Sequence, residues 1–149
     1  MPIRHEQMGG KEEVFSWSAP KREELLHFAA GRLSAYCAGI KYPVKQVALT
    51  KELVGRVATQ NGIEPDHFDR IAADRLHEPV TMLDMGDGTH VICDGSHRLI
   101  KRAMLGFDYV DAYDVPERVW RRFTIVGMPG ESSQWGEYLG SQNPFSGRY

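Results

Sequence analysis

The stretch THVICDGSHRLIKRAMLG, residues 89–106, decides the fold. Residues 89–93 form a short β-branched run, which is typical of a strand. Residues 99–105 have helical spacing and stop at Gly106. The polar residues 94–98 lie between the two, so the sequence predicts a strand, a tight turn and a helix in that order. Because a helix start carries unpaired N–H groups and partial positive charge, this turn is a candidate seat for a phosphate group.

Each residue of the turn can serve such a site. Gly95 allows a sharp turn and a close approach of the backbone to a ligand. Ser96 can cap the helix or donate its hydroxyl to a phosphate oxygen. His97 and Arg98 fall in the first helical turn, where cations are unfavourable unless an anion compensates them. Arg98 could bind a phosphate through two hydrogen bonds, and Lys101 and Arg102, one turn further, would extend the positive edge.

Two alternatives stay open at this turn. Asp94, Gly95 and Ser96 could merely cap a helix while His97 and Arg98 point into water, as in most short polar turns. Asp94 could hold Mg²⁺ through water beside a bound triphosphate, or it could anchor the turn through backbone hydrogen bonds. The turn is neither a Walker loop nor a dinucleotide fingerprint, because the required glycines and lysine are absent.

Length and composition restrict the class of protein. A chain of 149 residues is sufficient for one domain. Its net charge of −2 disfavours non-specific attraction to nucleic acid. There is no apolar run of transmembrane length, and two cysteines are no disulfide framework. We therefore expect a soluble cytoplasmic protein. The six histidines lack metal-binding spacing, so they predict no structural metal site.

The rest of the chain predicts an α+β fold in which helices flank a small mixed sheet. Three parts are expected: an N-terminal arm and helix (1–41), a core (42–126) and a Gly/Ser-rich tail (127–149). Within them, the patterns predict a polar arm over 1–17, helices over 18–39, 50–62 and 64–78, strands over 44–49, 80–85, 89–93 and 109–115, and a short helix from Pro116. The Asp87-Gly88 pair indicates a hairpin between 80–85 and 89–93. Thr50 is a candidate N-cap for the helix over 50–62.

A hairpin that leads into Asp-Gly-Ser-His-Arg and then Leu-Ile-Lys-Arg-Ala-Met-Leu-Gly resembles the core of the ParB/sulfiredoxin-like superfamily. Its members have a Gly-x-x-Arg or Gly-x-His-Arg turn here, followed by a helix ending in Leu-Gly. Glu78-Pro79-Val80 matches the proline-led strand before the family's hairpin. The resemblance covers residues 42–115 and is tightest over 79–106. It implies that residues 94–98 bind the phosphates of a nucleotide.

The branches of this superfamily imply different activities. Sulfiredoxins have Gly-Cys-His-Arg and bind ATP, but Ser96 stands at the cysteine position here, which argues against thiol repair. ParB partition proteins have Gly-Glu-x-Arg and bind CTP. Free-serine kinases have Asp-Gly-His-His-Arg, the turn closest to this one. Those kinases use an acidic residue near the first strand as general base. Glu52 is the loosely matching candidate, although its position favours a solvated acid in the first turn of a helix.

We therefore expect a nucleotide-binding protein that catalyses phosphotransfer or nucleoside triphosphate hydrolysis, in the manner of a kinase or NTPase. Its ligand would be ATP, ADP or CTP, with Mg²⁺ bridging the phosphates. His97 and Arg98 would stabilise charge, with Glu52 as a candidate base. An alternative is a non-catalytic regulator or adaptor that binds a nucleotide or DNA, acting alone or as a homo-oligomer. A ParB-like nuclease is the third option, disfavoured because no carboxylate pair has the spacing for two metals.

Overall fold

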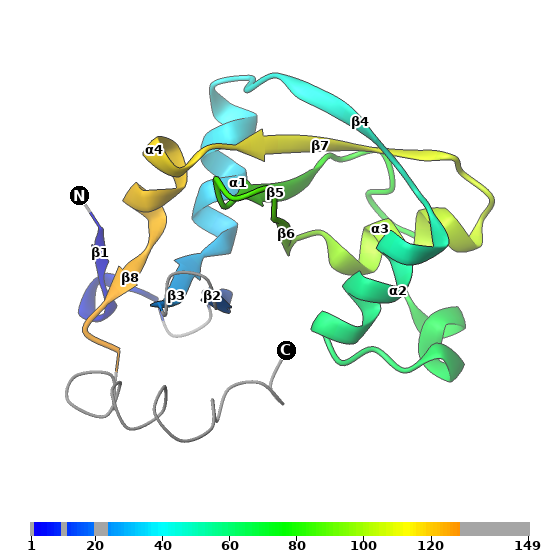
Figure 1. Ribbon diagram of the computed structural model, residues 1–149, viewed down its shortest axis with the longest axis horizontal. Coiled ribbons are helices and arrows are strands. Elements are labelled where there is room, and N and C mark those ends of the chain that lie inside the picture. The colour runs from blue at the N-terminus through cyan, green and yellow to red at the C-terminus, as the bar shows by residue number, and fades with distance from the viewer. Residues whose placement is uncertain (1, 10–11, 20–23, 129–149) are drawn as a thin grey trace.

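The protein has an α+β architecture built on a mixed four-stranded sheet, seen in a computed structural model that describes residues 2–9, 12–19 and 24–128 (Figure 1). The strand order is β4-β7-β5-β6. β5 and β6 form the predicted antiparallel hairpin, β7 runs parallel to β5, and β4 pairs antiparallel with β7 at the edge. The strands are β4 (Val44–Ala48), β5 (Val80–Asp84), β6 (His90–Asp94) and β7 (Tyr109–Val115).

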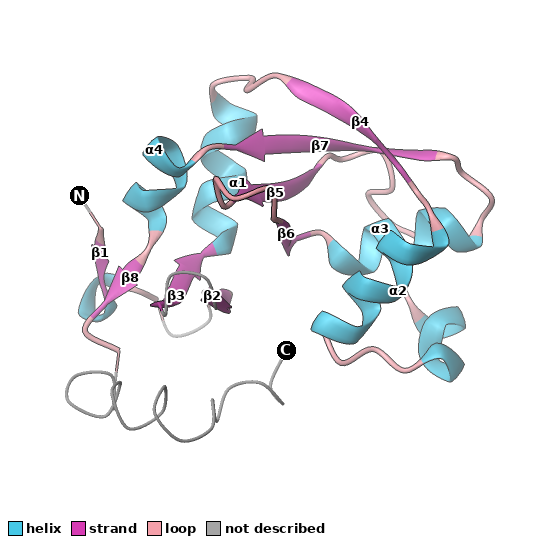
Figure 2. Ribbon diagram, viewed as in Figure 1, coloured by secondary structure: helices cyan, strands magenta, loops and turns pink. Residues whose placement is uncertain are grey.

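Helices pack on both faces of this sheet (Figure 2). α1 (Ala30–Gly39) contacts β5 and β6, and its Leu33 and Cys37 are buried in one core cluster with Leu83. α2 (Lys51–Gln60) and α3 (Ser96–Met104) belong to the second cluster, which contains the alternate strand residues. Because side chains of a strand alternate between faces, β5 contributes to both clusters.

The second helix was predicted with its start and its end. The Thr50 hydroxyl accepts a hydrogen bond from the Leu53 N–H at 3.1 Å, which is an N-cap. α2 then ends at Gln60, before Asn61.

The N-terminal part was predicted wrongly. Residues expected to form a polar arm contain β1 (Ile3–Arg4), the short 3₁₀ helix η1 (His5–Gln7) and β2 (Val14–Ala19). Residues expected to begin the first helix form β3 (Glu24–Ala29), an antiparallel partner of β2. Only α1 keeps the predicted helical state, and it ends at the predicted Gly39.

Burial explains why β3 is a strand. Its residues 25–29 are all buried, so apolar side chains are accommodated on both faces and helical spacing carries no information there. In β2, Phe15 and Trp17 alternate with serines, and their partners across the pair are Phe28 and Leu26. This period of two was the available signal for a strand.

The remaining elements are short. The helix predicted over 64–78 is reduced to the 3₁₀ helix η2 (Pro65–Arg70), followed by turns up to the next strand. After β7 come α4 (Glu117–Trp120), η3 (Arg121–Phe123) and β8 (Ile125–Val126), which pairs parallel with β1. Most of the predicted tail, residues 129–149, lies outside the described residues. Within the described part, no helix combines the length and apolar character needed to cross a membrane.

Residues from the predicted arm-and-helix part and from the predicted core share one apolar cluster. Phe28 and Leu33 pack there with Leu83 and Trp120. Phe28 and Trp120 meet edge to face, with ring centroids 5.4 Å apart. This packing fixes β2 and β3 against the sheet and so positions one wall of the cleft described next.

Candidate functional site

The predicted turn exists and is held tightly at Gly95. Gly95 has a φ of +93°, in the left-handed region, and α3 begins at Ser96. A Cβ at Gly95 would lie 2.7 Å from Val80 Cγ1, closer than carbon atoms can approach. The Gly95 carbonyl accepts from the Leu99 N–H at 2.9 Å. Among the described residues, no side chain caps this helix start, so the N–H groups of its first turn remain available.

A β-bulge in β6 precedes Asp94, whose side chain is bonded to α1. Thr81 pairs with Asp94 but Met82 pairs with Ile92, so Cys93 is an extra residue in β6. Asp94 Oδ2 accepts a hydrogen bond from Ser34 Oγ of α1 at 2.5 Å, and Ser34 Oγ lies 2.7 Å from the Thr81 hydroxyl. Asp94 therefore anchors the turn, one of the two roles considered from sequence, although through a side chain. Its role as a Mg²⁺ ligand stays a prediction.

Arg98 folds back across the turn. Its Nη2 donates to the Pro79 carbonyl at 2.9 Å, which ties the start of α3 to the start of β5. Its Nε is buried and has no hydrogen-bond partner in the described part of the chain. A buried donor without a partner is costly, and an added acceptor beside it would be stabilising. The guanidinium thus makes one structural contact, and its buried Nε–H is left without an acceptor in the described part of the chain.

The turn forms the floor of a cleft of about 970 Å³. One wall comes from β2 and β3, and the other from the segment after α2 that includes η2. The described lining residues are residues 13–16, His27, residues 61–63, His67, residues 70–72, Asp74, Arg75, residues 93–98 and Met128. This volume is in the range of sites for small molecules.

Charge in the cleft is balanced rather than strongly basic. The described lining contains three arginines, Arg70, Arg75 and Arg98, and three acidic residues, Glu13, Asp74 and Asp94. With neutral histidines these formal charges cancel. A groove that follows a nucleic-acid backbone needs an excess of cations, so this cleft suits a compact ligand better than DNA.

The other predicted site residues divide into two groups. Ser96 is buried and His97 is exposed, and both line the cleft. Lys101 and Glu52 do not belong to its described lining, and Glu52 is exposed in the first turn of α2. The roles assigned to Lys101 and Glu52 therefore gain no support from the geometry.

Arg102, which sequence placed on a positive edge with Lys101, is used inside the fold. It donates to the carbonyls of Tyr109 and Leu76 and packs over the Phe107 ring. These contacts tie α3 to β7 and to the loop before β5.

Sequence reasoning missed a hydroxyl–imidazole pair on the opposite wall. Ser16 Oγ of β2 lies 2.7 Å from Nδ1 of His27 of β3, and both residues line the cleft. His27 is only 5% exposed. The two residues are direct partners in the β2–β3 pair, on the face opposite Phe15 and Phe28. Had the sequence been interpreted as two paired strands here, Ser16 would have been placed opposite His27.

The two cysteines are poor nucleophiles. Burial raises the pKa of the Cys37 thiol to about 11. Burial, and then the charge of Asp94, raise the pKa of Cys93, which lines the cleft but is 5% exposed. Because the thiolate is the reactive form, neither cysteine suits thiol chemistry in the folded chain.

We expect both thiols to resist alkylation in the folded protein at pH 8. With a pKa near 11, about one Cys37 side chain in a thousand is a thiolate at that pH. Iodoacetamide followed by mass spectrometry should show an unmodified folded chain. The same treatment in denaturant should modify both thiols. Rapid labelling of either cysteine before unfolding would contradict the burial described here.

Comparison of the chain with protein-family models, curated proteins and solved structures finds no match. The interpretation of the cleft therefore depends on its own geometry.

Proposed function

We propose that the cleft binds the phosphates of a nucleoside di- or triphosphate at the start of α3. The observation that carries this proposal is the uncapped helix start on the floor of the cleft, together with the buried Arg98 Nε. Free N–H groups, a helix dipole and a guanidinium donor are complementary to a phosphate group.

The arrangement of elements supports a ParB/sulfiredoxin-like core, which we propose as the fold type. The resemblance implies a proline-led strand, a hairpin, a glycine turn and a helix followed by a strand. The chain contains these as Pro79, β5, β6, Gly95, α3 and β7 in that order. The same resemblance implies nucleotide binding at residues 94–98.

Different residues of the cleft would contact different parts of the ligand. The N–H groups of residues 96–98, the Ser96 hydroxyl and Arg98 Nε would bind one phosphate group. His97 and Arg70 are exposed at the cleft and would contact the outer phosphates. Val14, Ser16 and His27 on the β2–β3 wall would contact the base or the sugar.

The reaction we propose is transfer of the terminal phosphoryl group to a hydroxyl or to water. The acceptor oxygen forms a bond to phosphorus, the bond to the bridging oxygen breaks, and a nucleotide shortened by one phosphate leaves. The acceptor proton must go to a base. The Ser16–His27 pair lines the cleft whereas Glu52 does not, so we assign proton acceptance to His27. Mg²⁺, when bound to the phosphates, would neutralise their charge.

Calorimetric titration of the full chain with ATP, CTP and ADP tests the binding step. We expect saturable binding that weakens with salt. Arg70→Ala should raise Kd about tenfold, because it removes one charge-assisted contact. Arg70 is exposed, so this change should leave the fold intact. Arg98 is a poorer choice, since its loss also removes the contact with Pro79.

Arg56→Ala is the matched control, because Arg56 is exposed on α2 and outside the described cleft lining. It should bind like the unaltered chain. Absence of binding for all three nucleotides would contradict the proposal. Binding without turnover would instead support the alternative of a non-catalytic regulator.

A further inference from the structure

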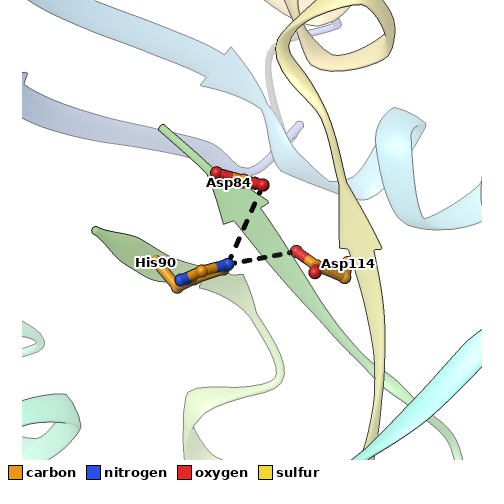
Figure 3. Close-up of side chains that lie close together, drawn as sticks. All are labelled: Asp84, His90 and Asp114. Atoms are coloured by element: carbon orange, nitrogen blue, oxygen red, sulfur yellow. Dashed lines mark ion pairs between the residues drawn. The ribbon is translucent and has the colours of Figure 1, made fainter. Parts of the chain in front are cut away.

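Three polar side chains converge at the hairpin end of the sheet (Figure 3). His90 Nε2 lies 3.9 Å from Asp84 Oδ2 and 3.6 Å from Asp114 Oδ1. Potential ligand atoms of the three residues all lie within 4.8 Å of one another. In the described part of the chain, this is the one such group of three. The separations are too long for hydrogen bonds, so the imidazole faces both carboxylates without bonding to either.

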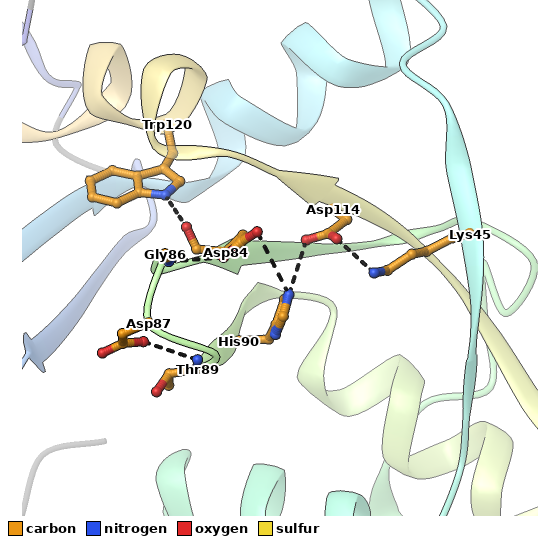
Figure 4. A network of polar contacts seen from close by, with 8 residues as sticks. All are labelled: Lys45, Asp84, Gly86, Asp87, Thr89, His90, Asp114 and Trp120. Atoms are coloured by element: carbon orange, nitrogen blue, oxygen red, sulfur yellow. Dashed lines mark hydrogen bonds and ion pairs between the residues drawn. The ribbon is translucent and has the colours of Figure 1, made fainter.

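Each carboxylate makes a second contact through the oxygen that does not face His90 (Figure 4). Asp84 Oδ1 accepts from the Gly86 N–H at 2.8 Å, while Oδ2 faces His90. Asp114 Oδ2 pairs with Lys45 Nζ at 2.6 Å, while Oδ1 faces His90. Asp114 Oδ1 is buried and has no hydrogen-bond partner among the residues that the structure describes. One oxygen of each carboxylate is thus fixed by an outer contact, and the other is directed to a common point, as in oriented metal sites.

We propose that Asp84, His90 and Asp114 form a binding site for a divalent transition metal ion. Such an ion satisfies the orphaned oxygen of Asp114 and neutralises the two carboxylates that face each other across His90. One imidazole nitrogen and two carboxylate oxygens are suitable ligands for Zn²⁺. Mg²⁺ and Ca²⁺ prefer oxygen ligands alone and should bind more weakly.

The distances suit this assignment. Ligands about 2.0–2.2 Å from a tetrahedral Zn²⁺ lie roughly 3.4 Å from one another. The separations of 3.9 and 3.6 Å from His90 Nε2 therefore require shifts of only a few tenths of an ångström, while the two carboxylate oxygens lie within 4.8 Å of one another and would close on the ion. The side chains remain between 24% and 39% exposed, which leaves water access to the ion. Three protein ligands plus water is the coordination of an open zinc site.

This site is separate from the cleft and does not depend on the proposed nucleotide function. His90 and Asp94 stand at opposite ends of β6, about 13 Å apart for an extended strand. The ligands come from β5, β6 and β7, and Asp84 and His90 are direct partners in the hairpin register. The sequence showed no metal spacing because these contacts are made between strands.

Calorimetric titration of the tag-free full chain with Zn²⁺ tests the proposal. We expect saturable binding of one ion per chain. His90→Ala and Asp114→Asn should each raise Kd at least tenfold. Lys45→Gln should lower Kd several-fold, because it keeps a donor near Asp114 Oδ2 but removes a competing positive charge.

His77→Ala is the matched control, since His77 is exposed and lies outside the group. It should bind Zn²⁺ like the unaltered chain. Co²⁺ absorption provides a second readout, with a tetrahedral spectrum that the His90 variant loses. Absence of binding, or binding that the His90 and Asp114 variants leave unchanged, would overturn the site. An unchanged Kd in Lys45→Gln would overturn the competition assigned to Lys45.

Discussion

Gly95→Ala is expected to lower the free energy of unfolding by about 3 kcal/mol. Two penalties combine at this position. An alanine must adopt a φ of +93°, and its Cβ must lie 2.7 Å from Val80 Cγ1 in the core strand β5. Val80 is fully buried and cannot move aside without repacking its neighbours. Urea unfolding followed by circular dichroism measures the loss.

Gly88→Ala separates the two penalties. Gly88 has a similar φ of +89°, but nothing lies within 4 Å of a Cβ built there. Backbone strain alone should cost this variant about 1 kcal/mol. Equal losses in the two variants would show that the close approach of Gly95 to Val80 is not what fixes the turn.

Trp120→Ala is expected to cost about 4 kcal/mol, a large share of the stability of a single domain. The Trp120 side chain is fully buried, stacks edge to face on Phe28, and donates its indole N–H to the Asp84 carbonyl at 2.9 Å. Truncation leaves both a large cavity and an unpaired carbonyl oxygen. The measurement is again urea unfolding followed by circular dichroism.

Trp120→Phe keeps most of the ring volume and loses the hydrogen bond, so about 1–2 kcal/mol is expected. Both variants should unfold in one transition, because Phe28 and Trp120 lie in one cluster although they are far apart in the chain. Two separate transitions, or a loss below about 1 kcal/mol for the alanine variant, would contradict this shared core.

Short sequence patterns correctly predicted one hairpin and the ends of two helices. The Asp87-Gly88 turn predicted the β5–β6 hairpin, Thr50 predicted the cap of α2, and Gly106 predicted the end of α3. Each of these signals acts over a few residues, and tertiary contacts did not reverse it.

The N-terminal hairpin could not be predicted in this way. Residues 24–29 include good helix formers, yet they are a strand because β2 and the apolar cluster bury them on both faces. Pairing with β2, together with packing against residues far along the chain such as Trp120, outweighed a propensity difference of less than 1 kcal/mol per residue.

The same limit applies to the sites. The turn at 94–98 was found because its five residues are contiguous, although the contact of Arg98 with Pro79 was not foreseen. The Ser16–His27 pair and the Asp84–His90–Asp114 group require knowledge of strand pairing. Hairpin register alone would have brought Asp84 beside His90, but not Asp114.

The most direct test of the central claim is a ¹H–¹⁵N NMR titration of the full chain with ATP and with CTP. Phosphate binding at the start of α3 predicts saturable shifts of the Ser96, His97 and Arg98 amide signals with at least one nucleotide. These N–H groups would donate to the phosphate oxygens. A folded chain whose signals from residues 94–98 stay unchanged at millimolar nucleotide would contradict the account.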